Sequence, residues 1–164
     1  MYKGANQDHA FNTPLQVEGI RDLIKSLQES ADSKEVNAAF RSLNKQAAEM
    51  IADEAAPRAP RGEGYKKAGD LSRRKNYYAL NDRWLAELRV GGRKYSPRRG
   101  TAGHVGAYSG IVHFGTGKGL LGRKRPWVWQ AFNTKYEDFT KHYEVEIPKI
   151  VQKFADKRTI KTKN

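Results

Sequence analysis

Apolar residues recur at helical spacing in two segments of the early part of the chain. The first predicts a helix over about residues 19–30, from Val17, Ile20, Leu23, Ile24 and Leu27. The second predicts a longer helix over about residues 33–55, from Val36, Ala39, Phe40, Leu43, Ala47, Met50 and Ile51. Ser33 is the expected N-cap, and Pro57 is expected to stop the helix because proline has no amide N–H. Residues 1–16 are interpreted as a polar N-terminal arm.

The pattern changes to a period of two in residues 83–90, which predicts a half-buried strand. Residues 71–80 are its expected hairpin partner, with the turn near Asn81 and Asp82. A third strand is predicted over residues 108–114 and is expected to end at Gly115. The segments 57–70 and 91–107 are rich in glycine, proline and basic residues, so they are predicted to be long loops.

Helical spacing returns after Pro126. The apolar positions are Tyr136, Phe139, Tyr143, Ile147, Ile150, Val151 and Phe154. Pro148 is expected to kink or divide this last helix, and residues 157–164 are expected to form a frayed basic tail. The predicted class is α+β: a small antiparallel sheet packed by a long N-terminal helix and a C-terminal helix, with long basic Gly-rich loops. Residues 17–156 then form one domain between the arm and the tail.

The charge distribution points to polyanionic partners. The chain of 164 residues has a formal net charge of +13, and residues 57–125 alone hold 17 basic and 4 acidic side chains. Such a field attracts nucleic acid, an acidic protein surface or anionic lipid, and charge alone does not choose among them. The residues predicted to contact DNA or a partner subunit are Lys66, Lys67, Arg93, Lys94, Arg98, Arg99, Lys118, Arg123, Lys124, Arg125 and Trp127.

The sequence contains no recognisable catalytic motif. Residues 117–122 fit G-x-G-x-x-G, but Arg-Lys-Arg-Pro follows, so no helix can begin inside the motif and present its N-terminus to a phosphate. The four histidines lack metal-ligand spacing, there is no cysteine, and Ser109 is not in a G-x-S-x-G elbow. We therefore expect no enzyme, no metal and no cofactor. No apolar run approaches bilayer length and no signal peptide is evident, so a soluble, unexported protein is expected.

Four short motifs occur in a fixed order along the chain. The long helix is followed by Ala59-Pro60, and Gly69-Asp70-Leu71 opens a strand. Residues 108–116 read YSGIVHFGT, and Pro126-Trp127 leads through Ala131-Phe132 into the last helix. The motifs and their order resemble the tail-completion, or neck (head–tail joining), family of long-tailed bacteriophages, in which a strand is similar to residues 108–116. Two positions depart from the family pattern: His113 replaces a carboxylate, and Gln130 replaces a second proline.

The resemblance implies a structural virion protein without catalytic activity, assembled in the host cytoplasm into the neck of the particle. It implies a homo-oligomeric ring, with a hexamer expected, that meets the tail terminator or tail tube and the head-completion or connector proteins. Packaged DNA is an expected non-specific contact, and no membrane is involved. Of Trp127 and Trp129, one is expected in the core and the other at an interface. The net charge keeps open an alternative, a cellular nucleic-acid-binding protein associated with the nucleoid or the ribosome.

Overall fold

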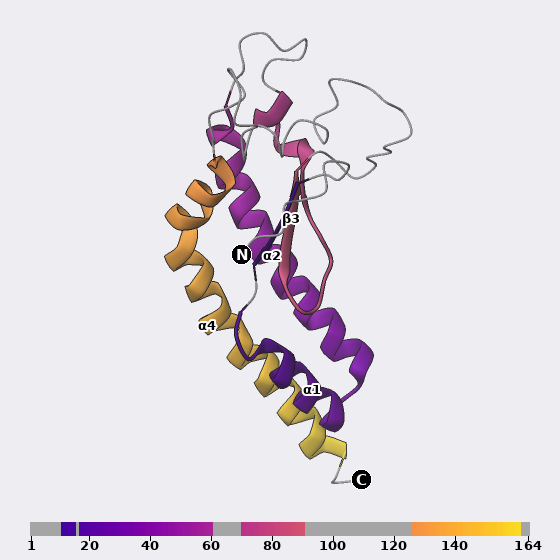
Figure 1. The fold of residues 1–164 in the computed structure, drawn as a ribbon. Coiled ribbons are helices and arrows are strands. Elements are labelled where there is room, and N and C mark those ends of the chain that lie inside the picture. The colour runs from indigo at the N-terminus through magenta and orange to yellow at the C-terminus, as the bar shows by residue number, and fades with distance from the viewer. Residues whose placement is uncertain (1–10, 16, 61–69, 91–125, 162–164) are drawn as a thin grey trace, which may run out of the picture.

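The computed structural model describes residues 11–15, 17–60, 70–90 and 126–161 (Figure 1). The helices are α1 (Ile20–Ser30), α2 (Ser33–Arg58) and α4 (Trp127–Lys161). The strands are β1 (Phe11–Leu15), β2 (Tyr77–Ala79) and β3 (Ala86–Val90). Two short 3₁₀ turns, η1 (Asp70–Ser72) and η2 (Arg74–Asn76), precede β2. The described part of the chain is therefore an α+β fold with a small antiparallel sheet, as the sequence predicts.

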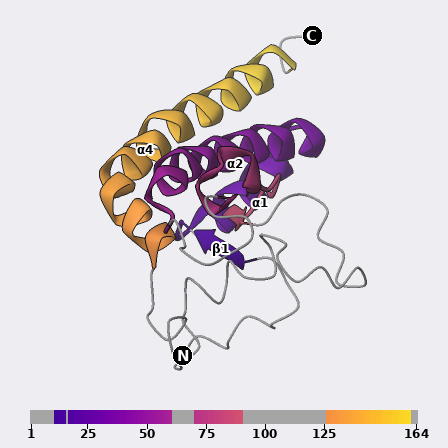
Figure 2. The ribbon, with the colours of Figure 1, turned by 90° about the horizontal axis from the view of Figure 1, so that it is seen from above.

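Helix α2 forms the centre of the fold. It packs against α4 on one side and against β2 and β3 on the other (Figures 1 and 2). Small side chains line its C-terminal half, where Ala47, Ala48, Ala52 and Ala55 are fully buried, so neighbouring elements can approach its backbone closely. The expectation that the C-terminal helix also covers the sheet is met mainly at the first turn of α4, where Trp127 reaches Tyr77 of β2.

The ends of α2 differ from the predicted ends. Asp32, rather than Ser33, is the N-cap: its carboxylate accepts a hydrogen bond from the backbone N–H of Lys34 at 2.7 Å. Pro57 does not stop the helix, which continues to Arg58. A proline in the last turn removes only one backbone hydrogen bond. The end is completed by the Ala59 N–H, which donates to the Ala56 carbonyl, and by an ion pair between Arg58 and Glu54.

The predicted hairpin is present, although its first strand is shorter than expected. β2 and β3 pair in antiparallel register, with Tyr77 opposite Val90. Within residues 71–80 only the last part is a strand, because the preceding residues form the two 3₁₀ turns. The Asp82 carboxylate fixes the hairpin turn by accepting backbone hydrogen bonds from Trp84 at 2.6 Å and Leu85 at 3.2 Å.

The interpretation of residues 1–16 as an arm is wrong for residues 11–15. These residues form β1, which pairs antiparallel with β3 and gives the strand order β1-β3-β2. Because β1 contains Pro14 and lacks clear alternation, its sequence did not predict a strand. Its backbone partner on β3 is distant in the sequence, and sheet pairing of this kind is decided by tertiary contacts rather than by local propensity. Gly19, with a φ of +76°, then turns the chain into α1.

Helix α4 is longer and more continuous than predicted. Pro148 neither divides nor ends it, and the helix extends through residues 157–161, which were predicted to be a frayed tail. Proline at this position removes its own N–H bond to the carbonyl of Glu144. Because Glu144 and Pro148 are both exposed, water can satisfy that carbonyl. The predicted strand 108–114 and most of the two predicted loops lie outside the described residues.

Candidate functional site: an aromatic groove beside α4

Most of the predicted contact residues lie outside the described part of the chain. These residues are Lys66, Lys67, Arg93, Lys94, Arg98, Arg99, Lys118, Arg123, Lys124 and Arg125. Their role stays a prediction.

Trp127 is the exception, and its prediction as an interface residue is wrong. Its side chain is 1% exposed, because the first turn of α4 places it in the core beside Tyr77 of β2. Its Nε1 donates a hydrogen bond to the Tyr77 hydroxyl at 2.8 Å, and that hydroxyl donates to the Leu71 carbonyl at 2.7 Å. Burial raises the pKa of Tyr77 well above the usual tyrosine value. Trp129, by contrast, is half-buried and faces a groove.

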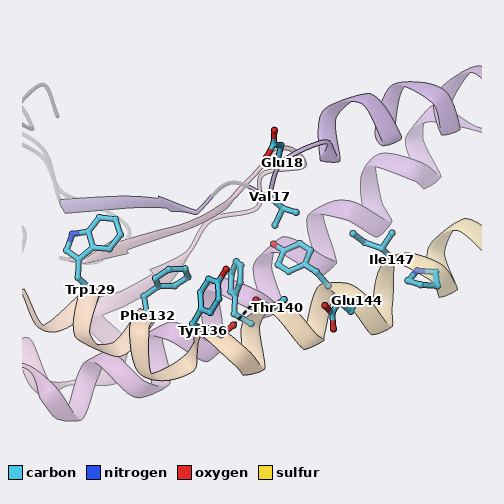
Figure 3. A pocket seen from close by; sticks show the side chains of 11 residues that line it. Val17, Glu18, Trp129, Phe132, Tyr136, Thr140, Glu144 and Ile147 are labelled. Atoms are coloured by element: carbon cyan, nitrogen blue, oxygen red, sulfur yellow. Dashed lines mark hydrogen bonds between the residues drawn. The ribbon is translucent and has the colours of Figure 1, made fainter. Parts of the chain in front are cut away.

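The groove lies between α4 and the Val17–Glu18 segment that leads into α1 (Figure 3). Its volume is about 660 Å³. One face of α4 supplies most of the wall, because residues three and four apart lie on the same side of a helix. The lining residues from α4 are Trp129, Phe132, Tyr136, Phe139, Thr140, Tyr143, Glu144, Ile147 and Pro148.

Aromatic rings form a continuous row along this wall. Phe132 stands at its centre, with its ring edge-to-face against Tyr136 at 5.8 Å and against Phe139 at 5.4 Å between centroids. Trp129 continues the row at 6.4 Å from Phe132, and Tyr143 continues it at 5.0 Å from Phe139. The row passes from buried to exposed: Phe139 and Tyr143 form the floor, whereas Tyr136 is 56% exposed. Exposed aromatic area of this kind is typical of binding surfaces.

A buried polar network holds the floor of the groove in place. Asn44 of α2 is fully buried, and its Oδ1 accepts a hydrogen bond from the Tyr143 hydroxyl at 2.8 Å. Its Nδ2 donates to the backbone carbonyl of Asp82, in the hairpin turn, at 3.1 Å. One side chain of α2 therefore connects α4 to the sheet. Burial raises the pKa of the Tyr143 phenol above the ordinary tyrosine value near 10, so this group remains a protonated donor in alkaline solution as well as at neutral pH.

The charged side chains among the described residues that line the groove are acidic. Of the described residues that line it, two are carboxylates, Glu18 on one side and Glu144 on the other, and none is a lysine or arginine (Figure 3). Both carboxylates are exposed to solvent. The described ranges contain 18 basic and 16 acidic residues, so they are close to neutral. The rest of the sequence contains 13 basic and 2 acidic residues, and residues 91–125 contain eight basic and none acidic.

The groups that line the groove suit the binding of a partner. Among the described residues, no group of three histidine, aspartate or glutamate side chains could hold a metal ion. The groove offers rings, aliphatic surface and two separate carboxylates, which suit a partner with apolar and cationic side chains. In the same ranges, no helix combines the length and apolar character needed to cross a membrane.

The sequence predicts that one of Trp127 and Trp129 lies at an interface, but it does not predict the groove. The aromatic spacing along residues 129–143 was visible, but a periodic row does not tell which of its members is covered.

Comparison of the chain with protein-family models, curated proteins and solved structures found no match.

Proposed function

We propose that this protein is a structural subunit of a bacteriophage neck, without catalytic activity, that forms a ring which completes the tail and joins it to the head. The motifs at Ala59-Pro60, residues 108–116 and Pro126-Trp127 support the proposal through their resemblance to the tail-completion family. The element order of long helix, small antiparallel sheet and C-terminal helix is compatible with it.

The observation that carries the proposal is the contrast between the described ranges, which are nearly neutral, and the rest of the sequence, which is strongly basic. The described ranges have a large aromatic groove and no metal-binding cluster. The rest of the sequence accounts for nearly all of the net charge. A ring subunit needs two surfaces that differ in character and are complementary to each other, because each copy meets its neighbours through two different faces. A partner ring or channel DNA would meet further basic residues.

Electron microscopy of particles with a gold-labelled antibody tests the proposed location. We expect gold at the junction of head and tail. A particle population made without the protein should contain heads and tails that remain unjoined, and supplying the protein should restore the joined form. Label elsewhere on the particle, or normal joining without the protein, would reject a role in the neck.

The basic stretch at Arg123, Lys124 and Arg125 is tested by reversing all three charges to glutamate. We expect loss of joined particles, because these residues are proposed to contact DNA phosphates or acidic partner subunits. The matched control reverses Lys25, Lys34 and Lys141, which are exposed on the helices and change the net charge by the same amount. Equal loss in both variants would show that only total charge matters.

A cellular nucleic-acid-binding protein is the second candidate, and the net charge of +13 favours it. Such a protein should bind duplex DNA with an affinity that falls linearly in log salt, with a slope of about 0.9 for each phosphate contacted. Co-sedimentation with nucleoid or ribosomes and absence from any particle would favour this candidate over the neck protein.

A further inference from the structure

The aromatic groove beside α4 has the size and chemistry of a site for an extended peptide segment. Its α4 residues run from Trp129 to Pro148, which corresponds to about 28 Å at the usual helical rise of 1.5 Å per residue. The half-exposed end offers the rings of Trp129, Phe132 and Tyr136, while Ile147 and Val17 lie toward the other end (Figure 3). The carboxylates of Glu18 and Glu144 are the charged groups of its lining.

We propose that this groove binds a second copy of the chain, through that copy's residues 117–125 (GKGLLGRKR). The inference rests on the proposed ring and identifies the face through which one subunit receives its neighbour. The segment pairs Leu120 and Leu121 with the cations Arg123, Lys124 and Arg125. Leucines fill apolar space between the rings, and arginine or lysine can stack on ring faces and approach the carboxylates.

Charge complementarity selects this segment. Among the residues that the structure describes, the lining carries two carboxylates and no cation, whereas the sequence of residues 91–125 holds eight cations and no carboxylate. Opposite charges on the two faces favour head-to-tail contact between copies and disfavour contact between two identical faces. Residues 117–125 can extend over about 30 Å at about 3.3 Å per residue, which matches the length of the groove.

Sequence adjacency argues against occupation of the groove by the same chain's segment. Residues 117–125 precede Pro126 directly, and Trp129 is the third residue of α4. A segment lying in its own groove would have to reverse direction around Arg125 and Pro126. Trp127 and Val128, the next two residues, are helical and buried, so a four-residue turn would have to be made by residues that precede them and would take up the last part of the segment. A neighbouring copy needs no reversal.

Disulfide trapping tests the contact, because the natural sequence contains no cysteine. Full-length Tyr136→Cys is mixed with a size-tagged full-length Leu121→Cys, and the pair is oxidised with diamide. The control replaces Tyr136→Cys with Val145→Cys, which is similarly exposed on α4 (44% against 56%) but does not line the groove. We expect at least about ten times more mixed dimer with Tyr136→Cys, since trapped yield follows effective concentration.

Two further measurements make the test specific. Adding Glu144→Lys to the Tyr136→Cys copy should lower the trapped yield several-fold, whereas Glu137→Lys, exposed and outside the lining, should not. Salt near 1 M should also lower the yield, because it shortens the screening length to about 3 Å. Equal trapping at Tyr136→Cys and Val145→Cys overturns the proposal.

A double variant distinguishes the two sources of the segment. This variant carries Tyr136→Cys and Leu121→Cys in one chain. The proposal is wrong if the variant forms an intrachain disulfide in a yield that does not fall when the protein is diluted, while the mixture of single variants traps nothing above the control. The groove is then filled by its own chain. Failure of the trapping experiment with gold still at the head–tail junction would reject this contact and leave the neck role standing. Successful trapping with gold absent from particles would support this contact and reject the neck role.

Discussion

The hydrogen bond between Tyr143 and Asn44 supports the floor of the aromatic groove, and Tyr143→Phe removes it with little change in shape. The two atoms are 2.8 Å apart, and the side chains are 4% and 0% exposed. The substitution leaves the Asn44 Oδ1 buried without this donor. An unsatisfied buried polar atom costs about 1–3 kcal/mol, so we expect the free energy of unfolding to fall by that amount.

Denaturant unfolding followed by circular dichroism measures the change. In a protein of this size, each kcal/mol lowers Tm by roughly 2–4 °C. The matched control is Tyr136→Phe, which deletes the same hydroxyl from an exposed tyrosine of the same helix. Exposed substitutions of this kind stay within about 0.5 kcal/mol.

A double-mutant cycle separates the hydrogen bond from general packing. Asn44→Leu alone leaves the Tyr143 hydroxyl and the Asp82 carbonyl without their partner, so it should destabilise the protein as well. With Tyr143→Phe added, the remaining hydroxyl is gone, and the double variant should be more stable than the sum of the single changes by about 1–2 kcal/mol. An additive cycle, or a Tyr143→Phe variant as stable as Tyr136→Phe, would refute the reasoning.

Three further predictions concern stability. Burial raises the pKa of Tyr77 and Tyr143 above the ordinary tyrosine value near 10, so the unfolded chain loses these two protons at a lower pH than the folded protein does. The free energy of unfolding should therefore decline as pH rises above about 10. Tyrosinate absorbance that develops fully before the protein unfolds would contradict this. Asp82→Ala removes the acceptor of two backbone hydrogen bonds in the hairpin turn and should cost about 1–2 kcal/mol in denaturant melts, whereas Asp82→Asn should recover most of it. Pro148→Ala restores a backbone donor within α4 and should raise the unfolding free energy by about 1–3 kcal/mol; an unchanged Tm would mean that the helix is not continuous there in solution.

The helices and the hairpin followed from local pattern. The apolar positions at Ile20, Ile24 and Leu27 predicted α1. The alternation through Ala86, Leu88 and Val90 predicted β3. These six side chains are buried in the core. Periodicity works here because it reports which face of an element must be covered. The same pattern predicted where the long helices start to within one turn. The ends predicted from Pro57 and Pro148 were wrong, because water and nearby side chains can satisfy the carbonyls that a proline leaves without a backbone donor.

The groove required the tertiary structure. Trp127 and Trp129 are two residues apart in similar sequence surroundings, yet Trp127 is buried against Tyr77, fifty residues earlier in the chain, whereas Trp129 is half-buried at the groove. Asn44 resembles any polar residue on a helix until the fold brings it to Tyr143, ninety-nine residues away, and to the turn at Asp82. The sequence by itself determined which segments are helices, where the hairpin turns and where the positive charge collects. Only the tertiary structure decided which aromatic rings are covered and which remain open, because burial depends on partners that are distant in the sequence.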